Sequence, residues 1–185
     1  MTLREIVRRS AFVFTVAILL FGGAGASGVF AQDLRWSYVE GGWLLEDSDD
    51  VDSENGWFGG GTIGLKRFHF FGEYRDTGGF ESWETGGGWH GLFGDQFDLV
   101  AEAAYVDLEF DEGYRASGGF RWMMFDDIEV NAFYNHVDVG EFENDSVSVG
   151  GNWEFLKRLA VGGEWEWGDE ADSGRAYLRF YFQKD

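Results

Sequence analysis

The side chains that could do chemistry are carboxylates and guanidinium groups placed at every second position of several segments. Alternate side chains of a strand share one face, so opposite charges on neighbouring strands can pair, as Glu102 could with Arg121 across one hairpin. Glu164 or Glu166 could likewise pair with Arg175 or Arg179 across the last hairpin. The predicted network comprises Glu40, Glu73, Arg75, Glu102, Arg115, Arg121, Glu129, Glu164, Glu166, Arg175 and Arg179. With Glu84, Asp98 and Glu154 this face carries nine acids and five arginines, so a hydrated space that it lines would favour cations.

A second set of carboxylates gathers in segments between the alternating stretches. These segments, 46–56, 107–113, 138–145 and 168–174, contain no Lys or Arg, and we expect them to be loops. The first contains a possible cation cluster of Asp47, Asp49, Asp50, Asp52 and Glu54, because carboxylate oxygens bind Ca²⁺ and Mg²⁺. It lacks the mid-loop Gly of an EF-hand. The competing interpretation is a solvated acidic fringe that keeps the loops extended.

The best candidates for catalytic residues are His136 and Asp138, which are two positions apart near the end of one alternating stretch. The surrounding sequence, Asn135-His136-Val137-Asp138, contains no Ser that could act as a nucleophile. His69 and His90 fall on the polar parity of other stretches and are interpreted as packing or lumen residues. We therefore predict no enzyme activity and no cofactor.

The elements that must position these residues are strands, because period-two alternation recurs about ten times after Gln32 and no sustained helical period appears. The clearest example is Phe97–Trp122, a hairpin with one apolar face and one face carrying Glu, Arg, Ser and Gly. The ten predicted strands are 35–45, 57–65, 68–75, 83–92, 97–106, 114–122, 128–136, 147–155, 159–167 and 175–182.

The connections between these strands alternate between short turns and longer acidic stretches, as in an antiparallel meander. With no helix to cover it, such a sheet removes its unpaired edges by closing. The fold class predicted is therefore all-β, an up-and-down barrel of ten strands, with eight as the alternative if the first or fourth stretch does not pair.

The bulk of the side chains decides which face of such a barrel lines the interior and which face is on the outside. A narrow barrel has room inside only for interlocking side chains, and the many Trp, Phe and Tyr residues of the apolar face would overfill it. If instead the apolar face meets lipid, the charged face lines the interior and Trp and Tyr near the strand ends lie at the membrane interfaces. We therefore predict a transmembrane barrel.

The N-terminus predicts export. A basic start, the apolar run AFVFTVAILLF and small residues ending at Ala31 are typical of a cleaved secretory signal peptide. The predicted organisation is a signal peptide over 1–31 and a barrel over 32–185. A formal net charge of −20 argues against nucleic acid as a partner, and without Cys no disulfide can form.

Three short motifs carry a resemblance to a known family: Tyr38-Val39-Glu40-Gly41-Gly42, Phe97–Glu102 and Tyr114–Ser117. With them, 34–182 resembles the small outer-membrane β-barrel proteins of Gram-negative bacteria. The resemblance implies contact with outer-membrane lipid and with lipopolysaccharide, to which loop-bound divalent cations could bridge. It also implies recognition by the barrel-assembly machinery, for which Leu178, Phe180 and Phe182 form the candidate signal.

The function predicted from the sequence is a structural or interaction role in the cell envelope, with a charged and plugged lumen. The alternative is a narrow channel that prefers cations, favoured by the excess of acids on the inward face. A hydrolase acting at the barrel rim is the third possibility. The ligand of the acidic segments and the oligomeric state stay open.

Overall fold

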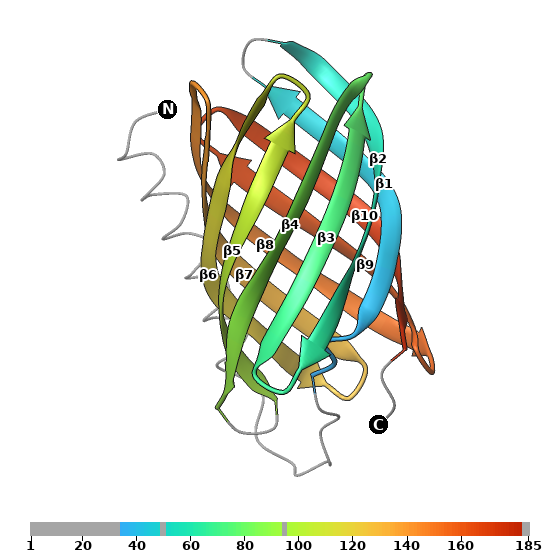
Figure 1. Cartoon of the computed structure of the whole chain (residues 1–185). Coiled ribbons are helices and arrows are strands. Elements are labelled where there is room, and N and C mark those ends of the chain that lie inside the picture. Colours follow the sequence, from blue (N-terminus) through green and yellow to red (C-terminus); the bar gives the residue numbers. More distant parts are fainter. Residues whose placement is uncertain (1–33, 49–50, 94–95, 183–185) are drawn as a thin grey trace. The chain divides into compact units, whose positions relative to one another are not determined.

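The chain folds into ten antiparallel strands, seen in a computed structural model that describes residues 34–48, 51–93 and 96–182 (Figure 1). The strands are β1 (Tyr38–Ser48), β2 (Val51–Leu65), β3 (Phe68–Thr77), β4 (Phe80–Leu92), β5 (Phe97–Leu108), β6 (Asp111–Phe125), β7 (Ile128–Val139), β8 (Phe142–Leu156), β9 (Leu159–Gly168) and β10 (Ala171–Tyr181). Each strand pairs with its chain neighbours, and β1 pairs with β10 to close the barrel. The predicted ten-stranded barrel is confirmed, and the eight-stranded alternative is not needed.

The parity of the sequence sets the two faces of the barrel. In β5, Asp98, Val100 and Ala104 are buried, whereas Leu99 and Tyr105 are exposed on the outside. The same alternation runs through the other strands, so the charged and small residues point inward. Among the described residues, no helix is long and apolar enough to cross a membrane.

The acidic segments are not loops, which corrects the prediction from sequence. Asp107 pairs with Glu112, Asp138 with Glu143, and the chain turns between them in only two residues. Polar side chains do not end a strand when its hairpin partner continues to supply backbone hydrogen bonds. The result is a set of hairpins that extend at one end of the barrel, which we call the outer end. The opposite end, with the turns 66–67, 126–127 and 157–158, is called the base.

Tight turns at both ends require backbone conformations that few residues adopt. Gly78 and Gly79 join β3 to β4 with φ of 61° and 93°, the positive values at both central positions that a two-residue hairpin turn prefers. At the base, Lys66 and Arg158 adopt φ of 58° and 76°, so these basic turns are made without glycine.

The outer surface of the barrel is an apolar belt. Phe70 and Trp43, for example, have 60% and 59% of their surface exposed. Toward the outer end, aromatic rings on neighbouring strands contact one another, with centroid distances of 5.2 Å for Trp57 and Tyr74 and 5.3 Å for Trp83 and Tyr105. This aromatic girdle contains Trp43, Trp57, Tyr74, Trp83, Tyr105, Tyr114, Tyr134 and Trp165.

Inward-facing glycines make room for large neighbours in the narrow interior. Tyr177 of β10 lies over Gly162 of β9, where an added Cβ would come within 2.5 Å of the tyrosine ring. Leu44, Phe58 and Tyr177 then form a small buried apolar cluster inside the lumen. This cluster lies beside Arg75 and Arg175, because Phe58 is opposite Arg75 and Leu44 is opposite Arg175.

Candidate functional site: the charged lumen

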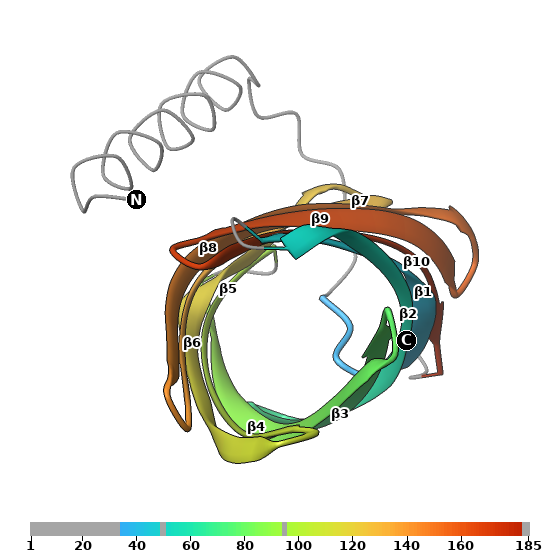
Figure 2. The same cartoon turned by 90° about the horizontal axis from the view of Figure 1, so that it is seen from above.

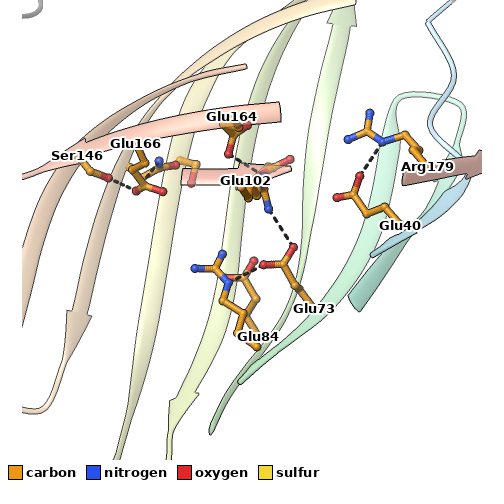
Figure 3. A network of polar contacts seen from close by, with 12 residues as sticks. Glu40, Glu73, Glu84, Glu102, Ser146, Glu164, Glu166 and Arg179 are labelled. Atoms are coloured by element: carbon orange, nitrogen blue, oxygen red, sulfur yellow. Dashed lines mark hydrogen bonds and ion pairs between the residues drawn. The ribbon is translucent and has the colours of Figure 1, made fainter. Parts of the chain in front are cut away.

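The candidate site is the barrel interior, where the strands bring the predicted charge network together (Figure 3). Glu40 comes from β1, Glu73 and Arg75 from β3, Glu102 from β5, Arg115 and Arg121 from β6 and Glu129 from β7. Glu164 and Glu166 come from β9, and Arg175 and Arg179 from β10. All of these side chains face inward because they share the polar parity.

Toward the outer end the arginines form a connected set of ion pairs. Arg115 donates two hydrogen bonds to Glu84, at 2.9 and 3.0 Å. Arg175 lies between two carboxylates, 3.1 Å from Glu73 and 2.7 Å from Glu164. Arg75 donates through Nε to Glu73 at 2.6 Å. The pair of Glu164 with Arg175 is one of those anticipated from the sequence.

Closer to the base, a second layer crosses the barrel. Arg121 donates two hydrogen bonds to Glu129, both 2.8 Å, and each of these side chains is almost fully buried. Arg179 donates to Glu40 at 2.7 Å across the seam between β1 and β10. Its guanidinium also lies 4.0 Å from the ring centre of Tyr38, a cation–π contact.

Two pairings expected from the sequence are replaced by others. Arg121 pairs with Glu129 instead of Glu102, because the register of the hairpin sets Glu102 opposite Ser117 and sets Arg121 opposite Asp98. Glu102 instead contacts His69 at 2.9 Å and lies 3.8 Å from Arg115. Arg179 lies opposite Glu40 in the closed barrel and therefore does not pair with the carboxylates of β9.

The base of the lumen is filled by residues 34–37, which we call the plug. The alternation of the sequence predicts a first strand that includes Arg35–Ser37, but β1 begins at Tyr38 and the plug turns into the ring of strands (Figure 2). Leu34, Arg35, Trp36 and Ser37 are all buried. The signal in the sequence was Arg35, a charged residue on the otherwise apolar parity.

Trp36 holds the plug against one wall of the barrel. Its indole Nε1 donates to Asp98 of β5 at 2.9 Å. Its ring stacks on the imidazoles of His69 and His90, at centroid distances of 4.4 and 4.2 Å. The guanidinium of Arg121 lies 4.1 Å from the Trp36 ring centre. The two histidines thus serve as packing residues of the plug.

Arg35 holds the plug against the opposite wall. It forms an ion pair with Glu154 of β8, and its guanidinium lies 4.0 Å from the ring centre of Tyr181 in β10. The backbone carbonyl of Arg35 accepts a hydrogen bond from Arg121 at 3.2 Å. Because Trp36 contacts β5 and Arg35 contacts β8 and β10, the plug bridges the barrel from wall to wall.

Above this layer the lumen contains a cavity of about 510 Å³. Its lining includes Glu46, Phe80 and Phe142 at the outer end, and it reaches down to Tyr38 and Phe71. No residue of the plug lines it. The interior is therefore hollow from the outer end down to the level of Tyr38 and Glu40, and packed below that level by the plug.

The remaining predicted sites lie outside the lumen. Asp47 and Glu54 are exposed on β1 and β2, Asp52 is a strand residue, and Asp49 and Asp50 fall outside the described residues. Among the residues that the structure describes, no group of three or more His, Asp or Glu could hold a metal ion. The predicted signal peptide, 1–31, also falls outside the described residues.

His136 lies on the outer surface near the outer end. Its Nδ1 lies 2.9 Å from Asp145 of β8, and the same carboxylate accepts a hydrogen bond from Tyr134 at 2.7 Å. The partner of His136 is therefore Asp145 rather than Asp138, and the group faces away from the cavity.

Two residues of the predicted assembly signal, Leu178 and Phe180, share the outward face of β10, and Phe182 follows directly after the strand. Leu178, Phe180 and Phe182 are exposed on the barrel exterior, with 44–55% of their surface accessible. Their alternation continues the apolar belt to the end of the last strand.

No family model matches the sequence, and no curated protein matches it. Among solved structures, the chain is similar to the KdgM porin, with a TM-score of 0.54 and 10% identity over 79% of this chain and 99% of the porin. The KdgM porin in complex with disordered oligogalacturonate gives the same values. The NanC porin has a TM-score of 0.55 and 6% identity, over 80% of this chain and all of that chain. At these identities the likeness shows the fold, a porin-like barrel, and the short motifs noted in the sequence assign no family.

Proposed function

We propose that the protein is an integral outer-membrane barrel that is closed at its periplasmic base and presents a charged cavity to the outside. It has a structural or interaction role in the cell envelope and does not act as an open pore. The observation that carries this proposal is the plug, which bridges the lumen between Asp98 on one wall and Glu154 on the other.

The membrane placement is supported by the outer surface. Exposed apolar side chains form a belt bounded by an aromatic girdle, as in barrels that span a lipid bilayer. Strands of 10–15 residues are also long enough to span a bilayer, since a tilted transmembrane strand needs about 9–11 residues. The fold that the chain shares with the KdgM and NanC porins agrees with this placement.

The orientation follows from the two ends. The hairpins that extend beyond the girdle are acidic, whereas two of the base turns are the basic pairs Lys66-Arg67 and Lys157-Arg158. Barrels of this kind keep their short turns in the periplasm, so we assign the extended acidic hairpins to the outside. There they face lipopolysaccharide, whose phosphates divalent cations could bridge to the carboxylates.

Planar-bilayer recording of the refolded barrel tests the closed base. We expect no steady conductance, because the plug and the layer of Arg121 and Glu129 leave no path through the base. Steady conductance of the unaltered protein would refute this role. It would favour the second candidate, a narrow channel that prefers cations, which is supported by the excess of carboxylates over arginines around the cavity.

We do not propose that this protein binds oligogalacturonate, the ligand named with the KdgM porin. Oligogalacturonate is a polyanion, and the cavity of this chain is lined by six carboxylates and three arginines. A polyanion would be repelled by that excess of negative charge.

A further inference from the structure

The outer cavity has the size and the mixed lining of a ligand site. Its volume of about 510 Å³ lies within the roughly 300–1,000 Å³ range of pockets that hold small molecules. One part of its wall is polar, and another carries Phe71, Val106, Phe133 and Phe142.

The arginines of this cavity are all engaged by carboxylates. Arg115 is held by Glu84, and Arg75 by Glu73. Arg175 bridges Glu73 and Glu164. The carboxylates lining the cavity are Glu40, Glu46, Glu73, Glu84, Glu164 and Glu166. Since Arg179 pairs with Glu40 from below, two of these carboxylates form no ion pair among the described residues, Glu46 and Glu166; Arg75 interacts with Glu166 only at longer range.

Glu166 is fixed in place by neutral donors. Asn135 donates to its Oε1 at 3.2 Å, and the hydroxyl of Ser146 donates to the same oxygen. Asn135 and Ser146 are buried, with 5% and 2% of their surface exposed. Both contacts use Oε1, so Oε2 has no hydrogen-bond or ion-pair partner in the described part of the chain. Neutral donors orient a carboxylate without cancelling its charge, which leaves one oxygen ready for a cation.

The aromatic part of the wall suits the same kind of ligand. Phe71 already has a cation near its face, the guanidinium of Arg115 at 5.5 Å from the ring centre. Phe133 and Phe142 line the cavity as well. Aromatic faces attract ammonium and guanidinium groups and also bury the apolar parts of a ligand.

We propose that the outer cavity binds a small organic cation with an apolar body, and that its charged group pairs with Glu166. The inference rests on the proposed function in one respect: a ligand reaches the cavity from the outer end because the base is closed. Binding itself does not require a closed base, so the two proposals can fail separately.

The test uses the refolded barrel in neutral detergent and isothermal titration calorimetry. The probes are benzyltrimethylammonium and, as an anion of similar size, benzenesulfonate. We expect the cation to bind and the anion not to bind. Glu166→Gln keeps an acceptor for Asn135 and Ser146 but removes the charge, and should weaken binding about 10-fold or more. The control is Glu143→Gln, because Glu143 is exposed on the outer surface, and it should leave the affinity within about twofold.

Several results would overturn the proposal. One is binding of the anion as tight as that of the cation, and another is no binding of the cation at all. The third is an unchanged affinity in the Glu166→Gln variant, provided that a heat-modifiability gel shows this variant to be a folded barrel. If Glu166→Gln does not fold, Glu46→Gln decides, because Glu46 lines the same cavity without a cationic partner and is partly exposed. That variant should bind the cation about 2- to 5-fold more weakly, and unchanged binding would refute the idea. Conductance of the unaltered protein with cation binding intact would refute the closed base alone.

Discussion

Replacing Trp36 by Ala should open the base of the barrel. Trp36 is 6% exposed, donates to Asp98 and stacks on His69 and His90. Truncating a buried Trp to Ala typically lowers stability by about 3–5 kcal/mol. The truncation also takes a hydrogen bond from Asp98, a fully buried carboxylate. Since about 1.4 kcal/mol corresponds to a factor of ten, the ratio of released to seated plug should rise roughly 100- to 4,000-fold.

The assay is single-channel recording in a planar bilayer with a salt gradient across it. We expect silence from the unaltered barrel and frequent openings from Trp36→Ala, with a reversal potential that shows preference for cations because carboxylates exceed arginines around the cavity. Trp43→Ala is the matched control, since it removes an indole from the apolar outer surface of the barrel, where Trp43 is 59% exposed. A Trp36→Ala barrel that is folded and silent, or a Trp43→Ala barrel that conducts equally, would show that Trp36 does not keep the base closed.

Three further predictions concern the stability of the barrel. Glu129→Ala leaves Arg121 buried without its bidentate partner and should lower the free energy of unfolding by about 3–5 kcal/mol. Urea titrations followed by Trp fluorescence measure this loss. A loss under about 1 kcal/mol would contradict the buried pair. Gly162→Leu puts a side chain where the Tyr177 ring lies and should cost about 1–3 kcal/mol in the same titration; an unchanged midpoint would contradict the close packing of this ring. Ala103→Arg places a charge midway along β5 on the outward face and should cost about 2–4 kcal/mol in lipid vesicles, whereas an unchanged midpoint would argue that this surface does not meet hydrocarbon.

The sequence predicted the strands and the faces of the barrel because both follow from local alternation. Phe97–Trp122 shows this clearly, since its charged parity lies in the lumen and its apolar parity lies on the outside. Strand ends were harder to predict. The polar stretch from Asp107 to Gly113 has no apolar alternation, yet it continues the hairpin because backbone pairing alone carries it.

Ion-pair partners could be predicted only in part, because they depend on register and on closure. Arg175 and Glu164 lie opposite each other in one hairpin, which the sequence can suggest. Glu40 and Arg179 lie opposite each other only once β1 meets β10, and no local pattern reports that register. The plug was missed for the same reason: the contacts of Trp36 come from β3, β4 and β5, far away in the sequence.

The seam between β1 and β10 has a consequence for the lifetime of the barrel. Its ion pair joins residues 139 positions apart, whereas every other pair of neighbouring strands is joined by a short turn. Contacts across so long a loop are slow to form, so we expect the seam to be made last, after the hairpins have assembled. Interactions formed after the rate-limiting step act mainly on the unfolding rate. The Glu40–Arg179 pair therefore determines chiefly how long the closed ring persists, and has little influence on how quickly it forms.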